Sequence, residues 1–256
     1  MKENRTKKIL NDGGVVFGTF ATEIGTPEVA RMMSASGFDF MFLDTEHSPF
    51  TMETVISNIR STKHLTMNCF VRVADAEYHL IARTLDAGAE GIMVPRIETG
   101  ETALKATSSV KYPPLGVRGY GVRGIITDYE PSSMGDVITH LNNNTMVILQ
   151  IESKQAVENI HEIASVKGVD VALIGPNDLS ISLGIPGEYK NPIYLDAVEK
   201  VIQECNNSGI SAGIHNRSIE DIAYWKKRGI RFLLYSTDSA LLLESASRSV
   251  KELKSL

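Results

Sequence analysis

Five polar residues of catalytically useful types lie at the end of an apolar run, or just past it. They are Asp44, His47, Arg72, Glu152 and Asp178. Apolar runs of this length are typical of buried parallel strands, whose carboxyl ends share one face when the strands close into an α/β barrel. We therefore expect these side chains to meet in one pocket, although they span much of the sequence.

Two of these residues are carboxylates that follow successive apolar runs. Glu152 directly follows the run 146–151. Asp178 follows the run 169–175 after Pro176 and Asn177. Neighbouring strands lie about 4.8 Å apart, so both carboxylates could contact one cation. An all-oxygen pair suits Mg²⁺ or Mn²⁺ better than zinc, with water and substrate as the remaining ligands. The alternative is that both are acids at helix N-termini that interact with the helix dipole.

A histidine and an arginine add acid–base and anion-binding chemistry. His47 lies three residues after Asp44, a carboxylate that could orient the imidazole and raise its basicity; the alternative is a solvated loop histidine. Arg72 stands between two valines, where a guanidinium is costly unless it pairs with an anion. That anion could be a substrate or an internal carboxylate. His215 ends another apolar run and is a further candidate for the pocket wall.

Some chemistries are disfavoured by what the apolar runs lack. The chain has eight apolar runs of strand length, and none of them contains a lysine, which a Schiff-base aldolase needs. The segments 215–218 and 235–238, after the last two runs, lack the glycine-rich turns of a barrel phosphate site, which disfavours phosphorylated substrates. The two cysteines, Cys69 and Cys205, lie in apolar or helical patterns and are expected to be core thiols.

The elements that position these residues follow a regular order. Eight apolar runs of strand length occupy 15–20, 38–44, 69–73, 91–96, 146–151, 169–175, 211–215 and 231–235. Most are continuous rather than alternating, as in parallel strands that are buried on both faces. Helical patterns lie between them, at 26–36, 51–60, 76–87, 100–110, 154–165, 192–207, 218–228 and 239–254. This alternation predicts an α/β fold of the (β/α)8 TIM-barrel type, with residues 1–256 as a single domain.

Two segments stand outside the alternation. Residues 111–136 are rich in Gly and Pro and carry two Gly-Val-Arg-Gly copies, around Arg118 and Arg123. A loop of this length in a compact domain is often a lid or a binding loop. The mildly basic N-terminus, with Lys2 and Lys7, is expected to form a solvated helical turn.

Composition excludes several classes of protein. Apolar residues make up 43% of the chain and charged residues 22%, which is ordinary for a globular protein and gives no transmembrane helix or membrane partner. The net charge of −5 without a dense Lys/Arg stripe argues against a nucleic-acid partner. The N-terminus has no apolar core of a secretory signal, so we expect a cytoplasmic protein.

A set of short motifs extends over nearly the whole chain. They are Gly37-Phe38-Asp39, Leu43-Asp44-Thr45-Glu46-His47, Val71-Arg72, Val94-Pro95, Tyr112-Pro113-Pro114, Gly116-Val117-Arg118-Gly119, Gln150-Ile151-Glu152 and Ile174-Gly175-Pro176-Asn177-Asp178-Leu179-Ser180. With these motifs the chain resembles the class II, metal-dependent 2-oxo acid (pyruvate) aldolases of the HpcH/HpaI type.

The resemblance implies a role for each matching residue. Glu152 and Asp178 would be ligands of a divalent cation, Mg²⁺ or Mn²⁺, and Arg72 would contact the ketone oxygen of the substrate. His47, oriented by Asp44, would be the base. The motif segments also imply substrate contacts from Gln150, Gly175, Pro176 and Asn177. Asp86 matches an acid that approaches the site of a neighbouring subunit.

The resemblance also implies an assembly and a reaction. Similar barrels form homo-oligomers, dimers or hexamers, and exchange their last helix, here 239–254. The reaction is reversible cleavage of a 4-hydroxy-2-oxo acid to pyruvate and an aldehyde through a metal-stabilised enolate. The chain departs from these aldolases at 125–136, 214–217 and 235–238, segments expected to border the pocket.

Two other functions stay open at this point. One is a related condensing or decarboxylating enzyme that acts on oxaloacetate or an acyl donor by the same enolate chemistry. The other is a non-catalytic sensor of 2-oxo acids, which would be stabilised by its ligand but would show no turnover. The presence of both His47 and Asp44 argues against the sensor, which has no evident need of a base.

Overall fold

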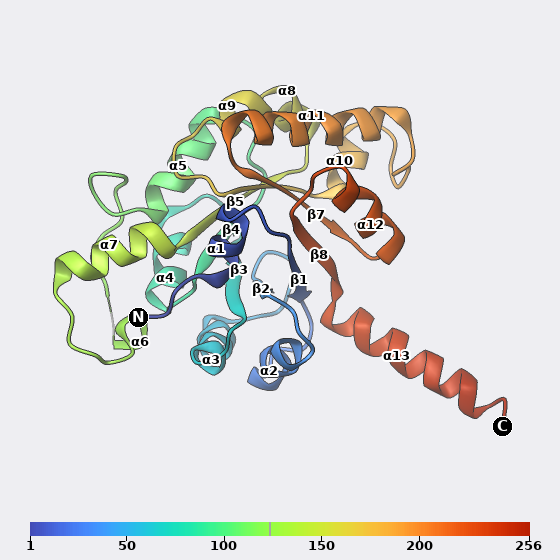
Figure 1. Cartoon of the computed structure of the whole chain (residues 1–256), viewed down its shortest axis with the longest axis horizontal. Helices are drawn as coiled ribbons and strands as arrows, with labels where there is room; N and C mark the ends of the chain where they lie inside the picture. Colours follow the sequence, from blue (N-terminus) through green and yellow to red (C-terminus); the bar gives the residue numbers. More distant parts are fainter. Residues whose placement is uncertain (123) are drawn as a thin grey trace.

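The computed structural model describes residues 1–122 and 124–256 and contains a closed barrel of eight parallel strands, β1 to β8 in sequence order (Figure 1). The strands are β1 (Val16–Ala21), β2 (Phe40–Asp44), β3 (Asn68–Arg72), β4 (Gly91–Val94), β5 (Met146–Ile151), β6 (Val171–Ile174), β7 (Ser211–Asn216) and β8 (Phe232–Thr237). Each predicted run overlaps one of these strands, and β1 pairs with β8 to close the ring. The predicted (β/α)8 fold is therefore confirmed.

Helices cover the outside of the barrel. They are α1 (Arg5–Asn11), α2 (Pro27–Ala35), α3 (Met52–Thr62), α4 (Tyr78–Asp86), α5 (Gly100–Val110), α6 (Gly124–Thr127), α7 (Met134–Asn144), α8 (Lys154–Glu158), α9 (Ile160–Ala164), α10 (Pro176–Ser182), α11 (Pro192–Ser208), α12 (Ile219–Lys227) and α13 (Asp238–Leu253). Thr51 caps α3 and Thr99 caps α5, each accepting a backbone N–H of the first turn. The single helix predicted over 154–165 is two helices in the structure, α8 and α9, because the helical conformation is interrupted at Asn159.

The barrel has two apolar layers, one inside the ring of strands and one between strands and helices. Aromatic rings dominate the inner layer: Phe40 stacks on Phe232 with ring centroids 4.2 Å apart, and Phe42 and Phe70 pack around them. Both cysteines are fully buried, and burial raises the pKa of each thiol to about 12. This confirms them as core thiols.

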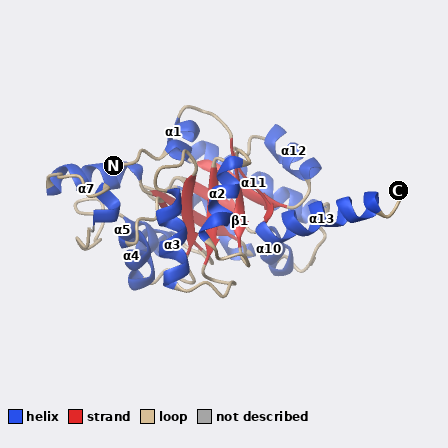
Figure 2. Cartoon of the chain, turned by 90° about the horizontal axis from the view of Figure 1, so that it is seen from below, coloured by secondary structure: helices blue, strands red, loops and turns tan. Residues whose placement is uncertain are grey.

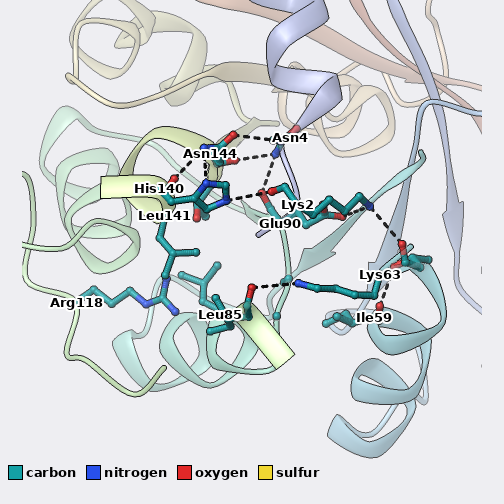
Figure 3. Close-up of a pocket in the computed structure, with 15 residues that line it drawn as sticks. Lys2, Asn4, Ile59, Lys63, Leu85, Glu90, Arg118, His140, Leu141 and Asn144 are labelled. Carbon is teal, nitrogen blue, oxygen red and sulfur yellow. Dashed lines mark hydrogen bonds and ion pairs between the residues drawn. The ribbon is translucent and has the colours of Figure 1, made fainter. Parts of the chain in front are cut away.

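The N-terminal segment forms the expected helical turn, as α1, but it packs against the barrel instead of being solvated. Lys2 Nζ lies 3.1 Å from Glu90 Oε2, and Lys7 Nζ lies 2.9 Å from Asp170 Oδ1. These carboxylates directly precede β4 and β6, at the amino ends of the strands, and Lys2 Nζ also donates to the backbone carbonyls of Thr62 and Met67. Figure 3 shows the small cavity beside this contact, in which His140 and Asn144 also bond to the N-terminal segment.

The segment 111–136 lies away from the carboxyl ends of the strands. It follows α5, which returns the chain to the amino-terminal end of the barrel, and it contains α6 and the start of α7 (Figure 1). Gly88, in the turn before β4, has φ +102°, and a Cβ there would lie 3.5 Å from the side chain of Ile125. Arg123, in the second Gly-Val-Arg-Gly copy, lies outside the described residues.

Helix α13 projects from the body of the barrel (Figures 1 and 2). Its first residue, Asp238, is buried, whereas Leu242, Leu243, Val250 and Leu253 are exposed. Within the described residues, no helix combines the length and the apolar character needed to cross a membrane.

Candidate active site

A cavity of about 710 Å³ lies over the carboxyl ends of the strands. The sequence-predicted residues that line it are Asp44, His47, Arg72, Gln150, Gly175, Pro176, Asn177 and Asp178. They come from β2, β3, β5, the β6–α10 junction and the loops that follow. The expected convergence of distant residues therefore occurs, and His215 lies in the same wall.

Arg72 and Asp44 form a bidentate ion pair at one side of the cavity. Arg72 Nε and Nη2 donate to Asp44 Oδ1 and Oδ2 at 2.8 and 2.7 Å, and Arg72 Nη1 lies 3.4 Å from Glu46 Oε2. Burial disfavours the ionised Asp44, but the hydrogen bonds and charge of Arg72 outweigh it, so the pKa of this carboxyl is lowered. Of the two partners left open for Arg72, the structure contains the internal carboxylate.

His47 is placed differently from our expectation. Its side chain is 69% exposed, and its Nε2 lies 3.7 Å from Glu46 Oε1. The Asp44 carboxylate accepts from Arg72 and from the backbone N–H of Glu46 at 3.0 Å, so it does not hold the imidazole. The prediction that Asp44 orients His47 is wrong in this structure, because Asp44 is paired with Arg72 and the imidazole is placed beside Glu46 instead.

Glu152 lies behind the cavity lining and is 8% exposed. Its Oε1 accepts the backbone N–H of Arg96 at 2.7 Å, and its Oε2 accepts from Gln150 Nε2. Burial raises the pKa of Glu152, and the nearby charges of Asp178 and Glu46 raise it further. The site therefore holds clustered negative charge that lacks full compensation.

The turn from β6 into α10 brings Asp178 to this cluster. A Cβ on Gly175 would lie 2.9 Å from both Gln150 Nε2 and Glu152 Oε2, so a larger residue here would displace the ends of these two side chains. Asn177 accepts from Tyr189 Oη at 2.6 Å through its Oδ1. Within residues 1–122 and 124–256, no hydrogen bond or ion pair occupies the Asp178 carboxylate.

Comparisons with known proteins identify the family of the chain. Residues 20–243 match the family model described as HpcH/HpaI aldolase/citrate lyase. The chain is 32% identical over 243 residues to a hydroxypyruvate/pyruvate aldolase of Delftia acidovorans, covering 95% of this chain and 90% of that protein. The chain belongs to the HpcH/HpaI family.

Two similar solved structures share the whole barrel. An HpcH/HpaI aldolase from Desulfitobacterium hafniense has a TM-score of 0.93 and 33% identity, with 98% of this chain and 96% of that chain covered. The citrate synthase SbnG has a TM-score of 0.87 and 31% identity, with 97% of each chain covered. Membership of the HpcH/HpaI family confirms the predicted class of enzyme, a carbon–carbon lyase of the aldolase type.

Asp86 is the one predicted site residue of this HpcH/HpaI chain that is far from the cavity. It ends α4 and accepts from Arg118 Nη2 at 2.9 Å on the outside of the barrel. The Arg118 guanidinium also stands 4.7 Å over the Tyr112 ring. The expected approach of Asp86 to a neighbouring subunit stays a prediction.

The segments expected to border the pocket divide into two groups. His215, Arg217 and Thr237 line the cavity, which confirms the expectation for 214–217 and 235–238. The segment 125–136 contributes no described residue to this cavity, because it leaves the barrel at the opposite end. As a lid, it would have to act on another copy of the chain.

Sequence reasoning missed three residues that organise the site. Glu46 contacts Arg72, His47 and Arg96, with Arg96 Nη2 3.6 Å away from Glu46 Oε1. Asp238 accepts the backbone N–H groups of the loop after β1, which forms part of the cavity rim. Glu46 belongs to the motif Leu43-Asp44-Thr45-Glu46-His47, and Arg96 ends the apolar run 91–96. The sequence therefore contained a signal for each of them.

Proposed function

We propose that the cavity catalyses reversible aldol cleavage of 4-hydroxy-2-oxo acids to pyruvate and an aldehyde. The observation that carries the proposal is the meeting of three kinds of group in one cavity: a charge-paired guanidinium, an accessible imidazole and a cluster of carboxylates. Together they match the needs of a reaction that develops an oxyanion and moves a proton.

The carboxylate cluster fits a hard divalent cation. Glu152 and Asp178 repel each other, and the buried Gln150 Oε1 beside them has no hydrogen-bond partner. The described residues contain no group of three or more His, Cys, Asp or Glu side chains suited to a metal ion, so Glu152 and Asp178 would hold it with water and substrate as further ligands. Mg²⁺ or Mn²⁺, when bound, supplies positive charge that offsets the oxyanion of the substrate.

Arg72 stabilises the same oxyanion from the other side. Its Nε and one N–H of Nη2 are bonded to Asp44, which leaves N–H groups on Nη1 and Nη2 for the ketone oxygen. The ion pair fixes the guanidinium before the substrate arrives, so little reorganisation accompanies the reaction. In this role Asp44 is a positioning residue that acts through Arg72.

His47 moves the proton. It accepts the proton of the C4 hydroxyl, directly or through water, as the C3–C4 bond breaks and the electron pair passes to C3 as an enolate. The aldehyde leaves, and protonation of C3 yields pyruvate. Backbone N–H groups of Asn177 and Asp178, at the start of α10, are available to the substrate carboxylate.

The test is a coupled assay of pyruvate release from 4-hydroxy-2-oxo acids, with EDTA and then with added Mg²⁺ or Mn²⁺. We expect the chelator to abolish turnover and the metal to restore it. Melting temperature gives a readout that is independent of turnover: Mn²⁺ should raise it in the wild type but not in Glu152→Gln. Turnover that persists in EDTA would remove the metal from the proposal.

A second candidate is condensation at the same site, with oxaloacetate as one substrate. The similarity to the citrate synthase SbnG favours it, because that protein covers the same barrel at 31% identity. An assay that offers pyruvate plus aldehydes in one arm and oxaloacetate plus an acyl donor in the other separates the two. Aldol products in the first arm alone support cleavage as the function.

We also propose that the chain forms a homo-oligomer through α13, as a dimer or a hexamer. The helix leaves its own barrel and exposes apolar side chains that a second copy would cover. The cytoplasmic location stays a prediction.

A further inference from the structure

The turn after β4 contacts the carboxylate cluster through its backbone. No described residue of 91–100 lines the cavity with its side chain. The backbone N–H of Arg96 nevertheless donates to Glu152 Oε1 at 2.7 Å. Glu152 Oε2 accepts from Gln150, so each oxygen of this buried carboxylate has one donor. The two hydrogen bonds together fix the plane of the carboxylate.

Arg96 makes this hydrogen bond in a strained conformation. Its φ is +52°, in the left-handed region, where the Cβ of an L-residue is crowded and which non-glycine residues rarely adopt. The residues on either side, Pro95 and Ile97, are buried. Because these neighbours are packed in place, a change of φ at Arg96 would turn the peptide plane that carries its N–H. The direction of the donor therefore depends on the strained conformation.

The side chain of Arg96 stabilises this conformation. Its Nη2 donates to the carbonyl oxygen of Ala74, in the loop after β3, at 2.7 Å, and the same nitrogen lies 3.6 Å from Glu46 Oε1. The Arg96 side chain is 61% exposed, so these polar contacts, rather than packing, determine its position. Strained residues persist where the surrounding structure holds them, and here the two contacts offset the cost of the left-handed conformation.

We infer that Arg96 is a positioning residue for the divalent cation, because its left-handed conformation directs a backbone N–H onto Glu152 and so orients the carboxylate that binds the metal. The inference rests on the proposed function, in which Glu152 is a ligand of the cation. It goes beyond that function by giving a role to a residue outside the cavity wall. The role needs the conformation of the backbone rather than the charge of the guanidinium, so mutation can separate the two.

Two substitutions that remove the same side chain make this separation. Arg96→Gly adopts a positive φ without steric cost, so its dissociation constant for Mn²⁺ should stay within about twofold of the wild type. Arg96→Ala retains the steric cost and lacks the two contacts, so its dissociation constant should rise roughly fivefold or more. Arg96→Asn should lie between them, because asparagine enters the left-handed region more readily than alanine. Calorimetry on the full-length, metal-free protein, without substrate, measures all three.

Tyr129→Ala is the matched control. Tyr129 has φ +61° and is 78% exposed, in the segment at the opposite end of the barrel. The substitution therefore places alanine in the same conformation without touching Glu152, and the dissociation constant for Mn²⁺ should not change. Melting temperature in EDTA reports on the fold separately. A role of Arg96 in the fold alone would lower the melting temperature of Arg96→Ala and leave its Mn²⁺ binding at the wild-type value.

The outcomes distinguish the inference from the proposed function. Wild-type affinity for Mn²⁺ in Arg96→Ala, or an equal loss in Arg96→Ala and Arg96→Gly, would overturn the inference alone. A wild type that binds no Mn²⁺ would overturn the inference together with the metal of the proposed function. Absence of pyruvate release in a wild type whose variants show the expected order of Mn²⁺ affinities would contradict the proposed function and leave the inference standing.

Discussion

The guanidinium of Arg72 and the carboxylate of Asp44 form two parallel hydrogen bonds at the carboxyl ends of adjacent strands. The register of β2 and β3 places the two residues directly opposite each other. Both side chains are largely buried, with 13% and 1% of their surface exposed. This pair links the stability of the barrel to the chemistry of the cavity.

Asp44→Asn should therefore damage both properties. Loss of the charge leaves the Arg72 guanidinium buried without its bidentate partner, which we expect to cost roughly 3 kcal/mol in the free energy of unfolding. A displaced guanidinium should lower kcat/KM for aldol cleavage by about 10²- to 10³-fold. Urea unfolding and the pyruvate-release assay measure the two effects. Asp12→Asn, in an exposed pair with Lys8, should change neither.

His47→Ala should separate activity from stability. The side chain is 69% exposed, so the free energy of unfolding should stay within about 0.5 kcal/mol of the wild type. Loss of the base should lower kcat/KM by about 10²- to 10⁴-fold. His64→Ala is the control, because this exposed histidine does not line the cavity and its removal should be silent. Wild-type turnover in His47→Ala would refute the assigned role.

Most of the fold could be predicted from the pattern of apolar runs. Apolar runs without alternation indicate strands that are buried on both faces, and the segment 146–151 matches β5 residue for residue. Carboxyl ends of parallel strands share one face, so the meeting of Asp44, Arg72 and Asp178 followed from the order of elements. Boundaries of the other strands differ from the predicted runs by one or two residues at an end: polar residues extend the pairing in β3, β7 and β8, whereas β2, β4 and β6 are shorter than the apolar runs.

The partner of Asp44 could not be predicted in the same way. Both His47 and Arg72 were within reach, and only the register of β2 against β3 decides between them. Periodicity contains no information on register. The expectation that 125–136 borders the pocket was wrong for the cavity of this chain. The order of elements contained the signal against it, because a segment between a helix and the next strand leaves a barrel at the end opposite the active site.

The free energy of unfolding should depend on pH through the protonation of His215. Burial lowers its pKa to about 4, whereas the unfolded chain has the ordinary value near 6.5, so between these values protons bind the unfolded state more tightly. The free energy of unfolding should thus fall with decreasing pH in this window, by up to about 1.4 kcal/mol per unit from this group. Urea titrations at several pH values should give a flatter curve for His215→Leu, and parallel curves would contradict the assignment.

The assembly should depend on the apolar face of α13. Light scattering should give the wild type the mass of a dimer or a larger oligomer. Leu242→Glu combined with Leu253→Glu places charges on exposed apolar positions and should yield monomers. Ser249→Glu, on the same helix at an exposed polar position, should retain the wild-type mass. A monomeric wild type would remove the proposed exchange of the helix.

The central claim is that Glu152 and Asp178 together bind one divalent cation on which a 2-oxo acid is held. Anomalous diffraction from crystals grown with Mn²⁺ and oxalate tests it most directly. We predict a single strong manganese peak in contact with both carboxylates and with the oxalate, on the side of the cavity that faces Arg72. A cavity that contains oxalate but no manganese at these two carboxylates would contradict the account.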